Sequence, residues 1–234
     1  MSENAVVEVR DINKHFGEGP TRVDALREVS IDVYPGTVVG LRGPSGSGKS
    51  TLLNVIGCIT EPNSGSLRLD GELVYENKWL RGDLRRLRLE KIGFIFQAHN
   101  LLPFLNAWEN VAVARVLAGA TSAQAKSRAL ELLSYLDVAK RSEASPGQLS
   151  GGEAQRIAIA RALANDPRII LADEPTAALD SQRARIVIDL LKKVAVEKRA
   201  AVIVVTHDEK IFDRFDHIFS LRDGALETSI AKAA

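Results

Sequence analysis

The sequence predicts an α/β fold with a buried parallel sheet. Two short and fully apolar runs, Ile169–Ala172 and Val202–Val205, are typical of strands that are covered on both faces. Segment 181–198 between them carries apolar residues at helical spacing, namely Ile186, Leu190, Leu191 and Val194. Another strand is expected at Thr37–Leu41, before a glycine-rich loop and an apolar helix at 52–56. Strands and helices that alternate in this way favour a parallel sheet.

The two ends of the chain are predicted to be rich in antiparallel strands. Val6–Val9 and Val29–Val33 alternate as strands do, and the glycines and proline of Lys14–Pro20 indicate a loop between them. A hairpin is expected at Leu67–Leu73, because Asp-Gly at its centre is a strong turn signal. The pattern of residues 217–228 predicts a further hairpin near the C-terminus.

Helical patterns are concentrated in the middle of the chain. Residues 125–136 have a helical pattern, and turn signals at 119–122 separate them from another helical stretch, so that 107–140 resembles a helical insertion. The basic segment 81–90 also favours a helix. Its charges fit either a solvated helix face or a contact with a membrane surface or a partner, and the sequence leaves both open.

Composition indicates an ordinary globular protein. The 234 residues include 45% apolar and 26% charged residues and carry a net charge of +1. The overall charge therefore does not indicate binding to nucleic acid or to an anionic membrane. The single cysteine, Cys58, excludes an internal disulfide. No apolar run approaches the roughly 18 residues of a membrane span, and the N-terminus lacks the pattern of a signal peptide. We therefore expect a cytoplasmic protein with no direct membrane insertion, bound at the membrane only through partners.

A phosphate-binding loop is predicted between the strand at 37–41 and the helix at 52–56. The motif G-x-x-x-x-G-K-[ST] is matched by Gly43, Pro44, Ser45, Gly46, Ser47, Gly48, Lys49, Ser50 and Thr51. Glycines let consecutive backbone N–H groups point into one concavity, and the helix N-terminus adds its positive dipole end. Lys49 can then reach the β- and γ-phosphates, and the Ser50 hydroxyl can ligate Mg²⁺. The sequence therefore predicts a nucleoside triphosphate site.

Two apolar strands end in polar side chains that suit this chemistry. Asp173 and Glu174 follow Ile169–Ala172, and His207 follows Val202–Val205. Beside the phosphate loop, Asp173 would hold Mg²⁺, Glu174 would polarise the attacking water, and His207 would reach the γ-phosphate. By themselves, the acids would also suit the first turn of a helix, and the histidine would suit an ordinary polar strand end.

Residues 149–156 predict a second anion site. Ser150 is placed to cap a helix that runs to Ala164, and Gly151 and Gly152 open that helix. A plain helix cap is the alternative interpretation. One nucleotide does not need two phosphate sites on the same chain, whereas a head-to-tail homodimer does. In such a dimer, each Ser150-Gly151-Gly152 segment would close over the triphosphate of the other subunit.

These motifs, in this order, resemble an ABC-transporter ATPase subunit over residues 5–228. The family's motifs are matched by Gly43–Thr51 (Walker A), Gln97 (Q-loop), Leu149–Gln155 (signature), Leu171–Glu174 (Walker B), Ala178–Asp180 (D-loop) and His207 (H-loop). The resemblance implies ATP and Mg²⁺ as cofactors. Gln97 would contact the γ-phosphate through Mg²⁺ and lie beside a groove for membrane subunits. Ser150, Gly151, Gly152, Glu153 and Asp180 would contact nucleotide.

Within these motifs, the choice of residues resembles that of the macrolide-exporter and lipoprotein-release group. The group is indicated by Gly43–Gly48, Gly93–Gln97 and Asn100–Pro103. Segments 96–102 and 172–180 resemble the heterocyst-glycolipid exporter ATPase, and 14–19 resembles the haem-exporter ATPase. Glu153 stands where many relatives have Gln. Phe16 stands where many have a Tyr that stacks on adenine, and packing into the core is its alternative role.

The resemblance implies a P-loop NTPase fold in one domain over 1–234. Its RecA-like core and N-terminal antiparallel β subdomain would comprise 5–97 and 166–228, and an α-helical subdomain would comprise 98–165. The expected function is ATP hydrolysis in a homodimer that drives transport, with export of a lipophilic or amphipathic compound, through integral membrane permease subunits. A regulatory or cell-envelope ATPase that signals through a membrane partner without net transport stays open as the alternative.

Nucleic-acid relatives of this family fit poorly. DNA-repair relatives insert a long coiled coil between Q-loop and signature, whereas Gln97 and Ser150 lie only 53 positions apart and no heptads separate them. Translation relatives carry two cassettes in one chain, and this chain has one. We therefore expect no nucleic-acid partner.

Overall fold

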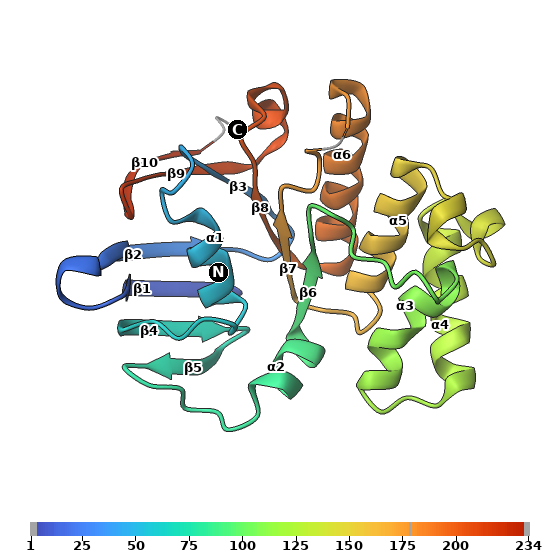
Figure 1. Cartoon of the computed structure of the whole chain (residues 1–234), viewed down its shortest axis with the longest axis horizontal. Helices are drawn as coiled ribbons and strands as arrows, with labels where there is room; N and C mark the ends of the chain where they lie inside the picture. Colours follow the sequence, from blue (N-terminus) through green and yellow to red (C-terminus); the bar gives the residue numbers. More distant parts are fainter. Residues whose placement is uncertain (1–3, 178, 232–234) are drawn as a thin grey trace.

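The computed structural model describes residues 4–177 and 179–231. In these residues the strands form two sheets, with α1 between them and further helices beside the larger sheet (Figure 1). The strands are β1 (Val7–Phe16), β2 (Val23–Val33), β3 (Val38–Arg42), β4 (Ser64–Leu69), β5 (Glu72–Glu76), β6 (Ile92–Ile95), β7 (Ile169–Asp173), β8 (Ala201–Val205), β9 (His217–Arg222) and β10 (Ala225–Ala231). The α-helices are α1 (Lys49–Ile56), α2 (Leu84–Lys91), α3 (Ala107–Leu117), α4 (Ser122–Tyr135), α5 (Gly151–Ala162) and α6 (Ser181–Lys198).

A four-stranded antiparallel sheet is built from the N-terminal part in the order β2-β1-β4-β5, as predicted. The predicted loop over Lys14–Pro20 is too long at its start. β1 continues to Phe16, which pairs with Val23, and only a short 3-10 turn at Gly19–Thr21 lies in the connection. This end of the two strands is solvent-exposed, so the sequence there shows no alternation of apolar residues. Cross-strand pairing nevertheless extends both strands, and that pairing could not be predicted from the residue pattern.

The six-stranded sheet is parallel except at one edge and has the order β10-β9-β3-β8-β7-β6. β3, β6, β7, β8 and β9 run parallel, and β10 pairs antiparallel with β9, which confirms the mixed α/β fold. The carboxyl ends of β3, β7 and β8 therefore meet at one edge of the sheet. The turn after β3, and the residues after β7 and β8, are brought together there.

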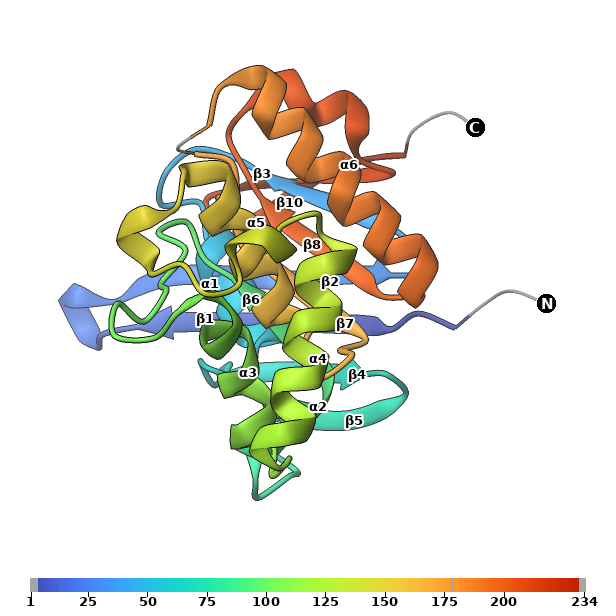
Figure 2. The ribbon, with the colours of Figure 1, turned by 90° about the vertical axis from the view of Figure 1, so that its right-hand side faces the viewer.

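Two apolar cores lie on opposite faces of this sheet. Alternate residues of β7 divide between them, because Ile170 and Ala172 belong to one core and Ile169 and Leu171 to the other. Helix α1 packs on the face that it shares with the antiparallel sheet, and α6 packs against β3 and β8 on the other face (Figure 2). This double covering explains why β7 and β8 are apolar throughout.

The helices mostly follow the sequence prediction, with three corrections. α2 begins at Leu84 instead of residue 81, because the Asp83 side chain accepts a hydrogen bond from the Arg86 backbone N–H and caps the helix there. α5 ends at Ala162 instead of Ala164. Ile186 is 47% exposed, because the buried stripe of α6 runs along Ala184, Val187, Ile188, Leu191, Val194 and Ala195. α3, α4 and α5 pack together beside the β6 edge (Figure 1).

Candidate functional site

The loop between β3 and α1 has a conformation that requires glycine at two positions. Gly43 has φ +149°, and a Cβ there would lie 2.1 Å from the Leu221 carbonyl oxygen. Gly48, the residue before α1, has φ +101°, and its Cβ would lie 2.3 Å from the Ala25 carbonyl oxygen. Both values are far below a permitted contact, so the loop closes against its neighbours only with glycine at these positions. The exposed Gly46 leaves open space above the loop.

Lys49 lies over this loop. Its Nζ donates to the Gly43 and Pro44 carbonyl oxygens at 2.9 and 2.8 Å. Burial lowers the pKa of the Lys49 ammonium below its ordinary value, and the carboxylates of Glu174 and Asp173 oppose that change. The ammonium is thus held at the mouth of the loop and faces two carboxylates.

The ends of β7 and β8 supply the facing side chains. The Glu174 carboxylate is bonded to Nδ1 of His207 at 2.8 Å, and the Glu174 backbone N–H donates to the Val205 carbonyl oxygen. Glu174 has φ +49°, a left-handed conformation that is uncommon for residues other than glycine and concentrates at functional sites. Burial first, and then the neighbouring Glu174 charge, raise the pKa of the Asp173 carboxyl, while the Ser50 hydroxyl and Lys49 oppose this change.

One cavity of about 440 Å³ joins these groups. Its lining includes Gly43, Ser45, Gly46, Ser47, Gly48, Lys49, Ser50, Thr51, Gln97, Asp173, Glu174 and His207. Val23, Ala25 and Val205 also line it, and the sequence prediction missed them because they are ordinary strand residues whose position alone brings them there. The structure therefore brings together the residues predicted after three separate strands.

The remaining predicted site residues lie outside this cavity. Pro44 belongs to the loop but is directed to solvent. Phe16 is 48% exposed at the end of β1, opposite Val23 of the cavity wall, and the Lys14 ammonium lies 4.9 Å from its ring centroid. Phe16 is therefore not a core residue. It stands next to the cavity with one face of its ring available.

The N-terminus of α5 has a fully formed cap. The Ser150 hydroxyl accepts a hydrogen bond from the Glu153 backbone N–H, and the Glu153 carboxylate accepts one from the Ser150 backbone N–H at 2.8 Å. Glu153 also pairs with Arg141 at 3.1 Å. The backbone N–H of Ser150 is the main cause of the lowered pKa of Glu153. Glu153, which stands where many relatives have Gln, thus makes its contacts with Ser150 and Arg141, both nearby in the sequence.

In the part of the chain that the structure describes, nothing sterically requires Gly151 and Gly152 to be glycine. Neither has a positive φ, and a Cβ at either position would meet no atom within 4 Å. This contrasts with Gly43 and Gly48, which close contacts demand. Asp180 likewise lies at an exposed helix start, where its carboxylate accepts hydrogen bonds from Gln182 and Arg183 backbone N–H groups. The preceding Ala178, predicted with it in one motif, lies outside the described residues.

The oxygen donors beside the loop suit Mg²⁺. Ser50, Gln97 and Asp173 line the same cavity and offer a hydroxyl, an amide and a carboxylate. Mg²⁺ favours oxygen ligands and is commonly held by one or two carboxylates together with substrate phosphates and water. Among the described residues, no group of three or more His, Cys, Asp or Glu side chains forms a separate metal centre. The donor set fits a metal ion that binds together with phosphate.

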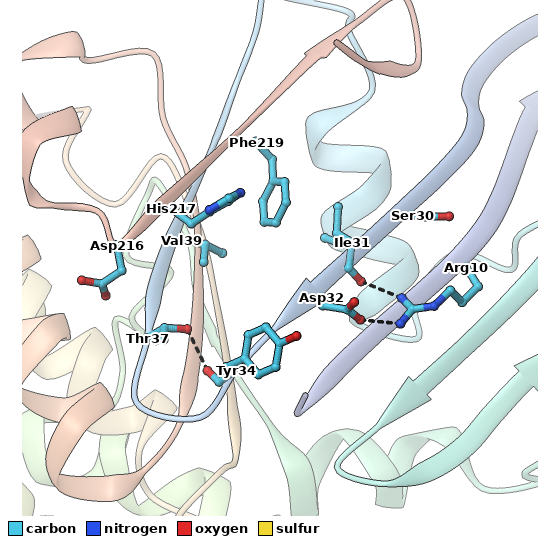
Figure 3. Close-up of a pocket in the computed structure, with 10 residues that line it drawn as sticks. All are labelled: Arg10, Ser30, Ile31, Asp32, Tyr34, Thr37, Val39, Asp216, His217 and Phe219. Atoms are coloured by element: carbon cyan, nitrogen blue, oxygen red, sulfur yellow. Dashed lines mark hydrogen bonds and ion pairs between the residues drawn. The ribbon is translucent and has the colours of Figure 1, made fainter. Parts of the chain in front are cut away.

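A second cavity, of about 590 Å³, lies where the two sheets meet near the amino ends of β3 and β9 (Figure 3). Its charged groups are already paired. Arg10 lies 2.7 Å from Asp32, and Asp216 pairs with Lys192 and accepts the Val38 backbone N–H. It has no glycine loop or helix N-terminus that could hold a phosphate, so it is not a second nucleotide site.

The fold and the first cavity define a P-loop nucleoside triphosphatase. The sequence pattern of the ABC transporter family matches residues 26–177, and the chain belongs to this family. The protein is accordingly an ABC ATPase, which binds ATP and Mg²⁺.

Relatives place it more closely. It is 44% identical to the lipoprotein-releasing system ATP-binding protein LolD of Novosphingobium aromaticivorans, over 95% of this chain and 98% of the relative. It is 42% identical to the macrolide export ATP-binding/permease protein MacB of Mannheimia succiniciproducens, over 94% of this chain but only 34% of the longer MacB protein. The predicted macrolide-exporter and lipoprotein-release group is confirmed.

Solved structures agree with this assignment. The dimeric post-hydrolysis structure of the ATP-binding cassette MJ0796, bound to ADP and Pi, has a TM-score of 0.86 and 39% identity, over 97% of this chain and 99% of that chain. In the part of the chain that the structure describes, no helix has the length and apolar character needed to cross a membrane.

Proposed function

We propose that this chain is the ATP-binding subunit of an ABC transporter and works as a head-to-tail homodimer on the cytoplasmic side of a membrane. ATP hydrolysis would drive transport through separate permease subunits, with export of a lipophilic or amphipathic compound as the favoured direction. The observation that carries the proposal is that the predicted nucleotide-binding motifs lie in two separate places on the chain. The phosphate loop, Gln97, Asp173, Glu174 and His207 line one cavity, whereas Ser150 and its two glycines lie outside that cavity at the start of α5.

Within one subunit, the roles follow from charge and position. Lys49 would exchange its two carbonyl partners for phosphate oxygens, and Ser50, Gln97 and Asp173 would hold Mg²⁺. Mg²⁺, when bound, neutralises charge on the phosphates. Glu174 would orient and deprotonate the attacking water, and His207 would hold the Glu174 carboxylate and the γ-phosphate in line through its two ring nitrogens.

The second half of each nucleotide site would come from the partner subunit. Gly151 is exposed and Gly152 is half-buried, and no neighbour among the described residues requires a glycine at either position. Glycine allows another molecule to come close to the backbone, and the first N–H groups of α5 would then meet a phosphate. Asp180 lies at the exposed start of α6 and would lie at the same interface. We retain residues 98–165, which contain α3, α4 and α5, as the proposed helical subdomain.

Mixing two variants tests the dimer. Ser150→Arg should abolish hydrolysis while ATP binding to the monomer stays within a few-fold, because Ser150 is outside the cavity. Lys49→Ala should lose binding or turnover in its own site. A mixture of the two subunits should regain at most one good site per dimer. If Ser150→Arg instead loses ATP binding as severely as Lys49→Ala, both motifs serve one site within a chain and the dimer proposal fails.

A groove next to the Q-loop is the proposed contact with the permease. It is lined by Phe94 of β6, by Phe96 just after that strand, and by basic residues that include Arg85 and Arg161. Phe96 is 38% exposed, and its ring stacks on Phe94 with centroids 5.8 Å apart. In the following segment Phe104 is 77% exposed, so it is available as an anchor, whereas Leu101 packs against the core.

Membrane recruitment tests this groove. The chain should bind membranes only when a permease subunit is co-expressed, and Phe104→Asp should release it while basal ATPase activity stays within a few-fold. Val196→Asp is the matched control, because Val196 is 65% exposed on α6 and belongs neither to the groove nor to the segment after Gln97 that carries Phe104. Equal release by both variants, or retention of Phe104→Asp, would remove Phe104 from the contact. Transport assayed in the full complex separates the transporter from an ATPase that only signals to a membrane partner.

A further inference from the structure

Segment 98–100, directly after Gln97, has a backbone that does not hold its shape by local preference. His99 and Asn100 both have φ +48°, so two successive residues other than glycine are left-handed. Each such residue is disfavoured on its own, Asn less so than most. Two local backbone bonds, from the His99 N–H to the Phe96 carbonyl oxygen and from the Asn100 N–H to the Ala98 carbonyl oxygen, help to hold this conformation, and groups outside the segment add to them.

Arg161 of α5 supplies the stabilising contacts. Its guanidinium donates from Nη1 to the Asn100 carbonyl oxygen and from Nη2 to the His99 carbonyl oxygen, both at 2.6 Å. The two bonds form a fork that only arginine can make, since its planar donors are fixed relative to each other. Burial lowers the pKa of Arg161, and no carboxylate in residues 4–177 and 179–231 forms an ion pair with it. Its charge is used on two backbone carbonyls.

Gln155, on the same helix, also faces this segment. Its side chain is 1% exposed and lies beside the His99 ring, but neither its Nε2 nor its Oε1 makes a well-formed hydrogen bond within the described residues. A buried amide without partners costs about 1–3 kcal/mol. Helix α5 therefore presents two polar side chains to segment 98–100: Arg161, which makes hydrogen bonds to it, and Gln155, whose amide makes no well-formed hydrogen bond in the described residues.

We propose that Arg161 is a positioning residue for Gln97: by holding the His99 and Asn100 carbonyls, it directs Gln97 toward the nucleotide cavity and joins that residue to α5. The inference rests on the proposed role of Gln97 in holding Mg²⁺. α5 begins at the Ser150 cap and carries Arg161 in its last turn, so one helix connects the proposed dimer contact with the Q-loop. Arg161 also lines the groove proposed for the permease, where a partner would touch it directly.

The test is a double-mutant cycle on the full-length protein. Arg161→Ala should lower kcat by roughly 10- to 100-fold, the scale expected for a displaced positioning group. It should also raise the Mg²⁺ concentration needed for tight ATP binding in calorimetry, while ATP binding measured without Mg²⁺ stays unchanged. Combined with Gln97→Ala, it should add little further loss, because both changes remove the same contact.

Arg128→Ala is the matched control for lost stability. Arg128 lies on α4, its side chain is 15% exposed, and it pairs with Glu131 and Asp166, away from segment 98–100. This variant should leave the Mg²⁺ dependence unchanged. Arg161→Lys keeps the charge without the fork and should stay several-fold impaired, which keeps the proposal testable if Arg161→Ala fails to fold.

The outcomes separate this inference from the proposed function. If Gln97→Ala itself has normal Mg²⁺ dependence and turnover, the proposed role of Gln97 fails. If Gln97→Ala is impaired but Arg161→Ala and Gln97→Ala effects multiply, or if Arg161→Lys is fully active, Arg161 does not act through Gln97 and the inference is overturned.

Discussion

Replacing Glu174 by Gln isolates the step in which water is activated. Gln has nearly the same shape and can still bond Nδ1 of His207, which is 2.8 Å from the Glu174 carboxylate. The left-handed backbone at residue 174 disfavours Gln and Glu alike, so the fold should keep its stability. What disappears is the ability to accept a proton. Loss of a general base costs about 10²-fold or more in turnover, or about 2.7 kcal/mol of transition-state stabilisation.

ATP binding should survive in Glu174→Gln, because Lys49, Ser50 and Asp173 are unchanged and one negative charge near the phosphates is removed. We therefore expect an ATP-bound dimer to accumulate on gel filtration while phosphate release falls at least 100-fold. Glu209→Gln, at an exposed carboxylate outside the cavity, is the control and should hydrolyse ATP normally. Turnover of Glu174→Gln within a few-fold of wild type would refute the assignment of Glu174 as the base.

Three further predictions concern the loop, the metal site and the core. Lys49→Ala should lose most ATP affinity or turnover in calorimetry and phosphate release with an unchanged circular dichroism spectrum; unchanged affinity and activity would contradict the assignment. Asp173→Asn should abolish Mg²⁺-dependent hydrolysis yet raise the thermal midpoint without nucleotide at pH 7. The folded-state pKa of Asp173 lies above 3.8, so its ionisation at higher pH costs stability that Asn does not incur, and an unchanged or lower midpoint would oppose this. Gly93→Ala should destabilise the fold by about 1–3 kcal/mol in urea unfolding, because its Cβ would lie 2.4 Å from the Ala162 carbonyl oxygen; Gly82→Ala, in open space, is the control, and equal stability of the two would contradict it.

The sequence predicted the parts of the site that depend on local rules. The phosphate loop needs glycines, a lysine and flanking strand and helix at fixed spacing, and each requirement is visible in consecutive residues. Asp173, Glu174 and His207 could be placed because a parallel sheet brings strand ends to one edge. The fold class followed from the same apolar runs.

The sequence could not predict contacts that depend on distant packing. Val23 and Ala25 line the cavity only because β2 crosses in front of the phosphate loop, and nothing in their residue type marks them. Arg161 resembles any basic residue near a helix end until its two bonds to His99 and Asn100 are seen. The wrong loop limit at Lys14 has the same origin, since cross-strand pairing with Leu26 keeps it in β1.

The two glycine pairs show how a structure separates constraints within a chain from constraints imposed from outside. Gly43 and Gly48 are held by backbone atoms 2.1 and 2.3 Å from where a Cβ would stand, so the fold of one subunit accounts for them. Gly151 and Gly152 meet nothing, and the Ser150 capping box forms without their help. If only the isolated chain mattered, alanine would favour the helix over glycine at both positions, since in a helix interior the difference is about 0.8–1.0 kcal/mol per residue. A sequence that keeps two glycines against this preference therefore favours close approach of another molecule to the start of α5. The same helix carries Arg161 near its end. A molecule that binds at the start of α5 would therefore contact the helix that, through Arg161, is proposed to position Gln97.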